Sequence, residues 1–375
     1  MPQKKSAKIQ DHFATLTDPR RRRVTYPLIN IVVIAVCAVI CGADDFVAIA
    51  HYGRKKRKWF ARFLDLKDGI PSHDRFNAIL AAIKPAEFEQ CLLSWITALH
   101  DITDGQVIAI DGKTLRRSFD AASGKAAIHM VSAWATANHI SLGQVVVDAK
   151  SNEITAIPKL LEILDISGAL VTIDAMGCQT EIARSILQGG GDYVLAVKGN
   201  QPTLHQGVAA YFDARLEDDF VGVKVRFCQT EEKGHGREET RYYYLCPVPE
   251  DLPDRARWPG LKAIGIAISA TVRDGKECNE VRYYILSKYL SARRFARAVR
   301  AHWGIENRLH WQLDVTFQED QCRIRKGHAD ANFSILRRTA LTMLKNESTH
   351  KIGIKNKRLV AGWDEEYLQQ VLVGT

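Results

Sequence analysis

Hydrophobic residues in the first hundred positions recur at the spacing of α-helices. The longest apolar run, residues 28–43 (LINIVVIAVCAVICGA), begins late for a signal peptide and is shorter than the roughly 20 residues needed to cross a bilayer. We therefore expect a buried helix there, in a cytoplasmic protein without a membrane anchor. Another helix is predicted to begin after Ser72 as its N-cap, with Phe76, Ile79 and Leu80 as its apolar stripe.

From residue 105 the pattern changes to short apolar runs with brief spacers. Residues 107–111 (VIAID), 128–135 and 140–148 predict three strands of an antiparallel meander. Helices at 157–164 and 180–187 then alternate with strands at 169–174 and 193–197, and a third helix is predicted after Pro202. The resulting order, β-β-β-α-β-α-β-α, is the ribonuclease H-like layout.

Residues 219–290 break this rhythm. Four alternating runs, at 221–227, 241–245, 263–272 and 280–286, predict a β-rich insertion. A long helix is expected from about residue 291 to beyond Trp311, and another over about 329–344.

The predicted fold class is therefore α/β. It has a helical N-terminal domain (1–100), a ribonuclease H-like domain around a mixed five-stranded sheet (101–218 with 291–350), the β-rich insertion (219–290) and a C-terminal tail (351–375).

Charge changes this picture by pointing to a partner. The formal net charge is +9, and residues 1–60 hold twelve Lys or Arg against four Asp or Glu. Two runs carry most of it: Arg20, Arg21, Arg22 and Arg23, then Arg54, Lys55, Lys56, Arg57 and Lys58. Either run alone is explained equally well by a solvated surface. Two runs flanking an apolar helix favour a polyanion, because neutralised phosphates release counterions.

The eight cysteines are scattered and form no CxxC pair. This pattern favours buried thiols in a reducing cytosol over a disulfide framework or a zinc site.

Two of the predicted strands end in an acid, Asp111 and Asp174. In the ribonuclease H layout the first strand lies beside the fourth and parallel to it, so these residues would lie about 4.8 Å apart at the carboxyl end of the sheet. Two carboxylates so close repel each other unless a cation lies between them, and Mg²⁺ suits such a site. A pair of ions about 3.5–4 Å apart can activate an attacking oxygen and stabilise a leaving one.

A third acid is expected from the long helix, where the candidates are Glu306, Asp314, Glu319 and Asp320. Spacing leaves Glu306 and Asp314 undecided, since eight residues turn a helix by only about 80° beyond two full turns. The flanking His302 and His310 could suggest zinc, but no other His or Cys stands at ligand spacing.

Four segments around these residues, IAIDGKTLRRS, VTIDAMGCQ, YVLAVKGNQP and HWGIENRLHWQLDVTFQED, occur in this order. They resemble the DDE transposases of bacterial insertion sequences, in the branch that includes the H-repeat-associated proteins. GADDF and GIPSHDRF near the N-terminus fit that branch's associated domain. The resemblance implies that Asp111, Asp174 and Glu306 are the catalytic, metal-binding triad, with a β-rich insertion between the second Asp and the Glu. It is the resemblance that selects Glu306 over Asp314.

One part of the family pattern is missing. Related transposases carry Tyr, Arg and Lys seven before, four before and seven after the Glu, where this chain has Val299, His302 and Leu313. Arg300 and Arg308 are the nearest substitutes for DNA contacts. Lys198 matches a motif lysine and is expected to hold a phosphate, although a turn lysine in water is an equally good explanation.

The resemblance implies a transposase that cleaves element ends and joins them to target DNA by metal-dependent hydrolysis and transesterification. Its cofactor would be two Mg²⁺ ions, for which Mn²⁺ substitutes, and its partner double-stranded DNA, with a homodimer in the synaptic complex. The protein would be associated with the nucleoid when bound to DNA. Two alternatives remain: a Mg²⁺-dependent nuclease without strand transfer, and an inactive DNA-binding relic of a mobile element.

Overall fold

The structure, a computed structural model, describes residues 8–21, 24–99, 106–115, 117–119, 127–137, 139–147, 152–234, 237–273 and 276–373. The chain divides into two units, each described by itself below. The first comprises Met1–Thr103, Gly112–Lys150 and Glu306–Thr375, and the second Asp104–Asp111 and Ser151–Ile305. The chain therefore passes between the units directly after Asp111 and directly before Glu306.

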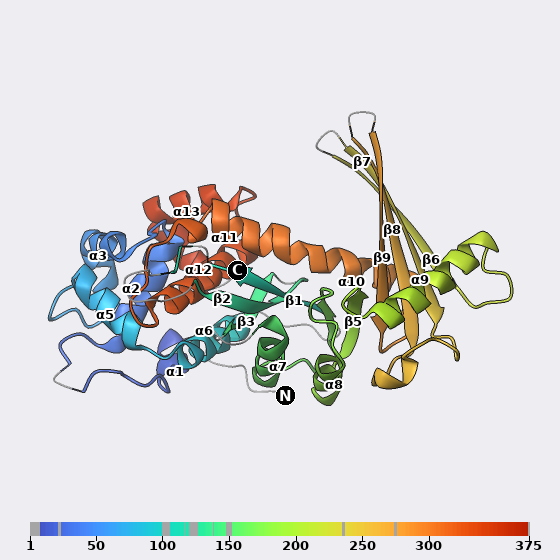
Figure 1. Cartoon of the computed structure of the whole chain (residues 1–375). Coiled ribbons are helices and arrows are strands. Elements are labelled where there is room, and N and C mark those ends of the chain that lie inside the picture. The colour runs from blue at the N-terminus through green and yellow to red at the C-terminus, as the bar shows by residue number, and fades with distance from the viewer. Residues whose placement is uncertain are drawn as a thin grey trace, which may run out of the picture. The chain divides into compact units, whose positions relative to one another are not determined.

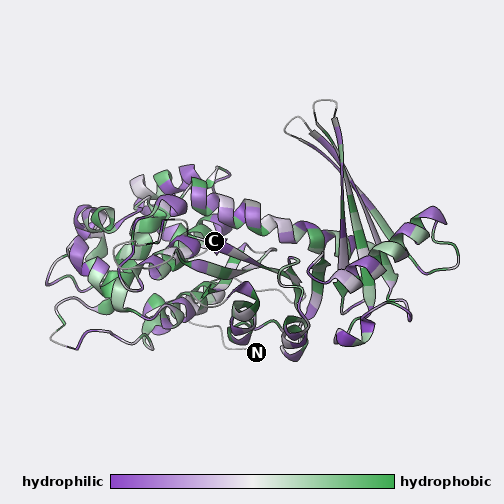
Figure 2. Ribbon diagram, in the orientation of Figure 1, coloured by the Kyte–Doolittle hydropathy of each residue, from purple (hydrophilic) through white to green (hydrophobic). Residues whose placement is uncertain are grey.

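Helices make up most of the first unit. They are α1 (Ile9–Phe13), α2 (Leu28–Ile40), α3 (Phe46–Lys55), α4 (Arg57–Phe60), α5 (His73–Ala82), α6 (Pro85–Leu99), α11 (Trp311–Val315), α12 (Ala329–Asn346), α13 (Ile354–Trp363) and α14 (Glu365–Val373). Helix α12 packs against α2, α5 and α6 (Figure 1), and it is buried from Ala329 to Leu344. Apolar residues concentrate where these helices meet (Figure 2).

Two helices confirm predictions made from the sequence. The apolar run forms α2, whose residues are buried from Asn30 to Ile40. Ser72 caps α5, and its Oγ accepts a hydrogen bond from the backbone N–H of Arg75 at 3.3 Å. No helix in the described part of the chain is both long and apolar enough to cross a membrane.

Within the described residues, nine strands form a mixed sheet in the order β3-β2-β1-β4-β5-β9-β8-β7-β6. They are β1 (Val107–Thr114), β2 (His129–Ala135), β3 (Ile140–Val147), β4 (Leu170–Ile173), β5 (Asp192–Val197), β6 (Arg226–Gly234), β7 (Arg237–Pro247), β8 (Ala263–Arg273) and β9 (Lys276–Leu286). Strand β1 pairs with β4 in parallel, and so does β4 with β5. Strands β2 and β3 pair antiparallel, as do β5 and β9 and the successive strands from β6 to β9.

The second unit also contains α7 (Glu153–Ile163), α8 (Thr180–Gln188), α9 (Pro202–Glu217) and α10 (Ala292–Ile305). Helix α8 packs against β5 and α10 against β4. The apolar face of α10, which includes Phe295 and Val299, is buried in one core with Leu170, Val194 and Leu286 of the sheet. This packing brings His302 of α10 next to Thr172 of β4.

The structure confirms that the first strand lies beside the fourth and parallel to it. It corrects the size of the sheet, which has nine strands instead of five. The four strands of the insertion join the same sheet because β9 pairs with β5. An unpaired edge exposes a row of backbone donors and acceptors, and β9 satisfies those of β5.

Three predicted boundaries were wrong. Strand β1 continues to Thr114, so Asp111 lies within the strand and not at its end. Strand β6 begins only at Arg226, because Gly222, inside the predicted run, adopts a left-handed backbone conformation, with φ of 76°, that interrupts an extended chain. The long helix is interrupted by a π-helical turn, Glu306–His310, between α10 and α11. The domain boundaries stay predictions.

Candidate active site

Asp111 and Asp174 occupy corresponding positions, directly after the last paired residues of β1 and β4. In the parallel pairing of β1 with β4, the last pair in register is Ile110 with Ile173, and each acid is the next residue in its chain. Both side chains are half-buried. The second unit therefore brings these two predicted ligands to the point where the parallel pairing of β1 with β4 ends, which lies towards the edge at which open α/β sheets bind ligands.

The loop that carries Asp174 is held by its own backbone and by the next loop. The Asp174 Oδ1 accepts a hydrogen bond from the Gly177 N–H at 3.2 Å. A Cβ at Gly177 would lie 2.2 Å from the Ile173 Cγ2, so only glycine fits there. The Asn200 side-chain amide donates to the Ala175 carbonyl at 2.6 Å, and that of Gln201 donates to the Cys178 carbonyl at 3.0 Å. The motif after β5 thus fixes the loop that bears Asp174.

A pocket of about 40 Å³ opens beside Asp174, and Lys198 and His302 are among the residues that line it. This volume holds only one or two water molecules. The Lys198 side chain is exposed, so its ammonium group is available to a phosphate. Lys198 and Asp174 line the same pocket, and the predicted contact of Lys198 with a phosphate stays a prediction.

His302 was not expected to be part of the site. Its Nδ1 lies 3.3 Å from the Thr172 Oγ1, one turn of α10 before Glu306. Burial lowers the pKa of His302 to about 4, although the neighbouring Asp174 carboxylate acts in the opposite direction. The imidazole is therefore neutral at pH 7 and does not supply the charge that an arginine would supply at this position.

Glu306 belongs to the first unit, so the three predicted ligands are divided between the two units. Its side chain is exposed and stands at the first position of the π-helical turn. Such turns occur frequently at functional sites. Lys345 of α12 stabilises this one by donating a hydrogen bond to the Arg308 carbonyl. Among the described residues, no three His, Cys, Asp or Glu side chains form a group that could hold a metal ion.

Two of the other candidate acids already share a cationic partner. The Lys113 Nζ forms ion pairs with Asp314 and, at 2.9 Å, with Glu319. The other Glu319 oxygen accepts a hydrogen bond from the Ser334 Oγ at 2.7 Å. Burial raises the pKa of Glu319, but the positive charges of Lys113 and Arg338 outweigh it and bring that pKa to about 2. Lys113 was missed in the sequence because nothing along the chain marks its partners.

Two of the three positions that depart from the family pattern have buried side chains. Val299 and Leu313 are both buried, so neither can reach DNA. Of the two substitute arginines, Arg300 is ion-paired with Glu232 and Arg308 is exposed.

The two basic runs contain both residues held in ion pairs and residues with exposed side chains. Arg20 is held by Asp18 and by the Tyr26 carbonyl, and Lys56 pairs with Glu365 at 3.2 Å. Exposed side chains are those of Arg21, Arg54, Lys55, Arg57 and Lys58, while Arg22 and Arg23 lie outside the described residues.

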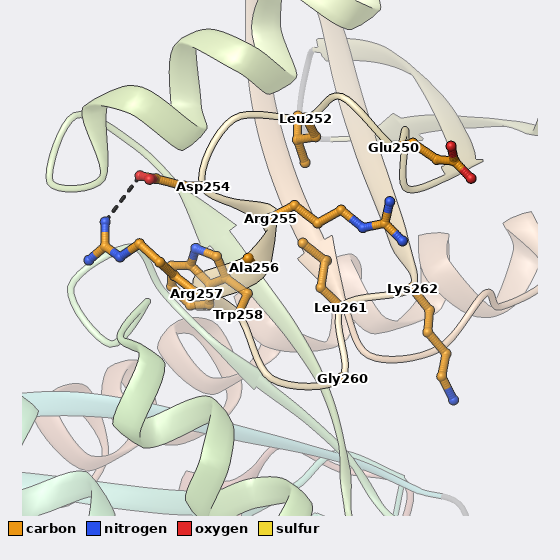
Figure 3. A pocket seen from close by; sticks show the side chains of 10 residues that line it. All are labelled: Glu250, Leu252, Asp254, Arg255, Ala256, Arg257, Trp258, Gly260, Leu261 and Lys262. Atoms are coloured by element: carbon orange, nitrogen blue, oxygen red, sulfur yellow. Dashed lines mark hydrogen bonds and ion pairs between the residues drawn. The ribbon is translucent and has the colours of Figure 1, made fainter.

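A larger hollow of about 580 Å³ lies on the connection from β7 to β8 (Figure 3). Arg257 in its wall is ion-paired with Asp254 at 3.0 Å, and the side chains of Arg255 and Lys262 point in different directions. No residue of the predicted site lines this hollow.

An acid pair on parallel strands of a mixed α/β sheet, with a basic helical N-terminus, is the arrangement expected of a metal-dependent nucleic-acid enzyme. Residues 102–343 match the family model described as the transposase DDE domain, and residues 10–96 match its DDE_Tnp_1-associated domain. The chain belongs to the transposase DDE domain family, which confirms the resemblance seen in its motifs.

Its relatives cover nearly the whole chain. It is 41% identical to the H repeat-associated putative transposase YhhI of Escherichia coli K12, over 98% of each chain. It is 42% identical to the putative transposase YncI of Escherichia coli O157:H7, over 96% of this chain and 93% of the relative.

A solved structure, the piggyBac transposase synaptic complex with hairpin DNA, aligns with 96% of this chain and 76% of its own at a TM-score of 0.42 and 10% identity. A score this low does not establish a shared fold.

Proposed function

We propose that this protein is a DNA transposase that cleaves the ends of its element and joins them to target DNA, with Asp111, Asp174 and Glu306 as metal ligands. The observation that carries the proposal is the register of β1 with β4, which ends at Ile110 and Ile173 and is followed on both strands by an aspartate. Membership in the transposase DDE domain family supports the same conclusion.

The donor chemistry of these residues fits Mg²⁺, a hard cation that prefers a few carboxylate oxygens and keeps several waters. Asp111 and Asp174 are half-buried on adjacent strands, so a cation between them would offset their repulsion. Asp314 and Glu319 are compensated by Lys113, which leaves the exposed Glu306 as the better third ligand.

Two Mg²⁺ ions, or Mn²⁺ in their place, would supply activation of the attacking oxygen and stabilisation of the leaving oxygen during in-line displacement. The protein's own residues would hold the metal ions and orient the DNA. Asp174 is fixed by Gly177 and by the loop after β5, and Lys198 at the pocket edge contacts a phosphate. Water attacks the terminal phosphodiester first, and the freed 3′-OH then attacks target DNA, so no covalent protein–DNA bond forms.

We further propose that β1–β5 and their helices form a ribonuclease H-like domain. Support comes from the strand order β3-β2-β1-β4-β5, the parallel β1–β4 and β4–β5 pairs and the antiparallel β2–β3 pair. DNA ends would be bound by the exposed basic residues of the N-terminal helices, in a complex of two protomers that brings two ends together.

The test replaces Asp111 with Asn and assays cleavage and joining of the element's own flanking DNA with Mg²⁺. We expect both activities to be lost while DNA binding survives, since Asn keeps the shape of the side chain but not its charge. Asp251→Asn, an exposed acid on the connection from β7 to β8, is the matched control and keeps full activity. Undiminished cutting by folded Asp111→Asn protein would refute the assignment.

The same assay separates the two alternatives. Cutting by the wild-type protein without joining would indicate a nuclease. DNA that is bound but never cut over a full Mg²⁺ titration would indicate an inactive relic.

A further inference from the structure

Lys113 is a buried cation that the proposed chemistry does not use. Its side chain is 8% exposed, and its ammonium group bridges Asp314 and Glu319. Glu319 is fully buried and is held on its second oxygen by Ser334 of α12. Arg338 adds positive charge nearby, yet within the described residues its three guanidinium nitrogens have no hydrogen-bond partner. The directional contacts of this cluster are therefore those of Lys113 and Ser334.

The cluster joins two segments that are far apart in the sequence. Lys113 and Asp314 are separated by 201 positions, and Lys113 and Glu319 by 206. Lys113 lies on β1, two residues beyond Asp111, and residues i and i+2 of a strand point to the same face. Asp314 lies on α11, which directly follows the π-helical turn that begins at Glu306.

Each of these segments begins where the chain enters the first unit. One entry is at Gly112, directly after Asp111, and the other is at Glu306 itself. Lys113 and its two carboxylates all lie within the first unit, so their ion pairs join the segment that follows one entry point to the segment that follows the other. Removing a cation from water is costly, and such pairs are retained where they specify one arrangement of the chain.

We propose that Lys113 is a positioning residue: through Asp314 and Glu319 it fixes the segment after Asp111 and the segment at Glu306, and so sets the geometry of the proposed metal ligands. This inference rests on the proposed function. The ammonium group of Lys113 is engaged by Asp314 and Glu319. It acts by holding the ends of two elements, as residues outside a metal's ligand sphere do in other metal sites.

The experiment measures Mn²⁺ binding to the full-length protein by electron paramagnetic resonance, with DNA cleavage as a second readout. Lys113→Met removes the ammonium group and keeps the stem. We expect the Kd for Mn²⁺ to rise about 10- to 100-fold, the usual effect of losing a residue that orients ligands. We expect kcat to fall while the KM for DNA is unchanged.

Lys357→Met is the matched control. Lys357 is also a buried lysine of the first unit, 6% exposed, and pairs with Glu347 at 3.1 Å. Its loss should lower the melting temperature without changing Mn²⁺ affinity. Equal Mn²⁺ affinities of the two variants, both folded at the assay temperature, would overturn the proposal.

A double variant separates positioning from stability. Lys113→Met leaves Glu319 buried without its cation, whereas Lys113→Met with Glu319→Gln leaves no unpaired charge at this pair. We expect the double variant to regain melting temperature but not Mn²⁺ affinity, and recovery of both would assign Lys113 a structural role only. Asp111→Asn reports on the proposed function itself. If it abolishes Mn²⁺ binding while Lys113→Met binds normally, only the present inference fails; wild-type protein that binds no Mn²⁺ would overturn both.

Discussion

At the scale of single residues, the structure assigns different environments to acids that look alike in the sequence. Glu306 is exposed on a π-helical turn, while Asp314 and Glu319 share one lysine. Spacing along a helix could not separate Glu306 from Asp314, because the property that distinguishes them is a partner on β1. The motif resemblance selected Glu306 without that information, and the ion pairs of Lys113 support the same choice on independent physical grounds.

His302 gives a prediction about pH. Its pKa is lowered to about 4 by burial, so between pH 6.5 and pH 4 the folded protein binds fewer protons at this site than the unfolded chain. The His302 contribution to stability is therefore present above pH 6.5 and is lost as the pH falls towards 4. In His302→Gln this loss is absent. We expect the stability of wild type relative to the variant to fall by about 1–2 kcal/mol between pH 7 and pH 5.

Urea denaturation of both proteins at the two pH values measures this difference. His51→Gln, at an exposed position on α3, serves as the control and should show a much smaller change. A difference between wild type and His302→Gln that does not depend on pH would contradict the prediction.

At the scale of elements, local signals set where helices begin, and tertiary contacts set where other elements end. Ser72 was recognisable as an N-cap because its side chain needs only the backbone N–H three residues later. The end of β1 was not recognisable. The strand passes Asp111 and reaches Thr114, and the Leu115 N–H then bonds the Ile128 carbonyl at 2.8 Å. The extension depends on a pairing partner that no local pattern contains.

Ser72→Ala should destabilise the protein by about 1 kcal/mol, because one donor in the first turn of α5 loses its acceptor. Ser72→Asp keeps an acceptor and should cost much less. The free energy of unfolding in urea measures both changes. Equal stabilities of the Ala and Asp variants would show that the cap contributes nothing here.

At the scale of the whole molecule, the helix between the two basic runs, α2, is part of the first unit's core. Helix α2 is buried and packs against α12, so deleting residues 1–60 to test DNA binding would also unfold the protein. Point substitutions avoid this problem. The exposed Arg54, Lys55, Arg57 and Lys58 can be replaced together by Gln without disturbing the apolar packing of α2.

We expect this fourfold variant to bind DNA more weakly, with a salt dependence shallower by up to about 0.9 for each phosphate that the protein no longer neutralises. The measurement is the slope of log K against log salt concentration by fluorescence anisotropy. Lys56→Gln is the control, because Lys56 is engaged by Glu365 and should change the slope little. An unchanged slope in the fourfold variant would exclude this segment from the DNA interface.

The sequence by itself determined the buried helix α2 and the cap of α5, because these follow from periodicity and short-range spacing. It also determined that β1 and β4 are parallel neighbours, through the order of the predicted strands and helices. Four ordered motifs also identified the family. Only the tertiary structure decided that β9 extends the sheet at β5, that the long helix breaks at Glu306, and that Lys113 forms ion pairs with Asp314 and Glu319. The physical reason is the sequence distance over which each signal acts. Hydrophobic periodicity can be recognised from residues a few positions apart, whereas the Lys113 ion pairs join positions about 200 residues apart. No spacing rule along a chain predicts which distant charges will be buried together.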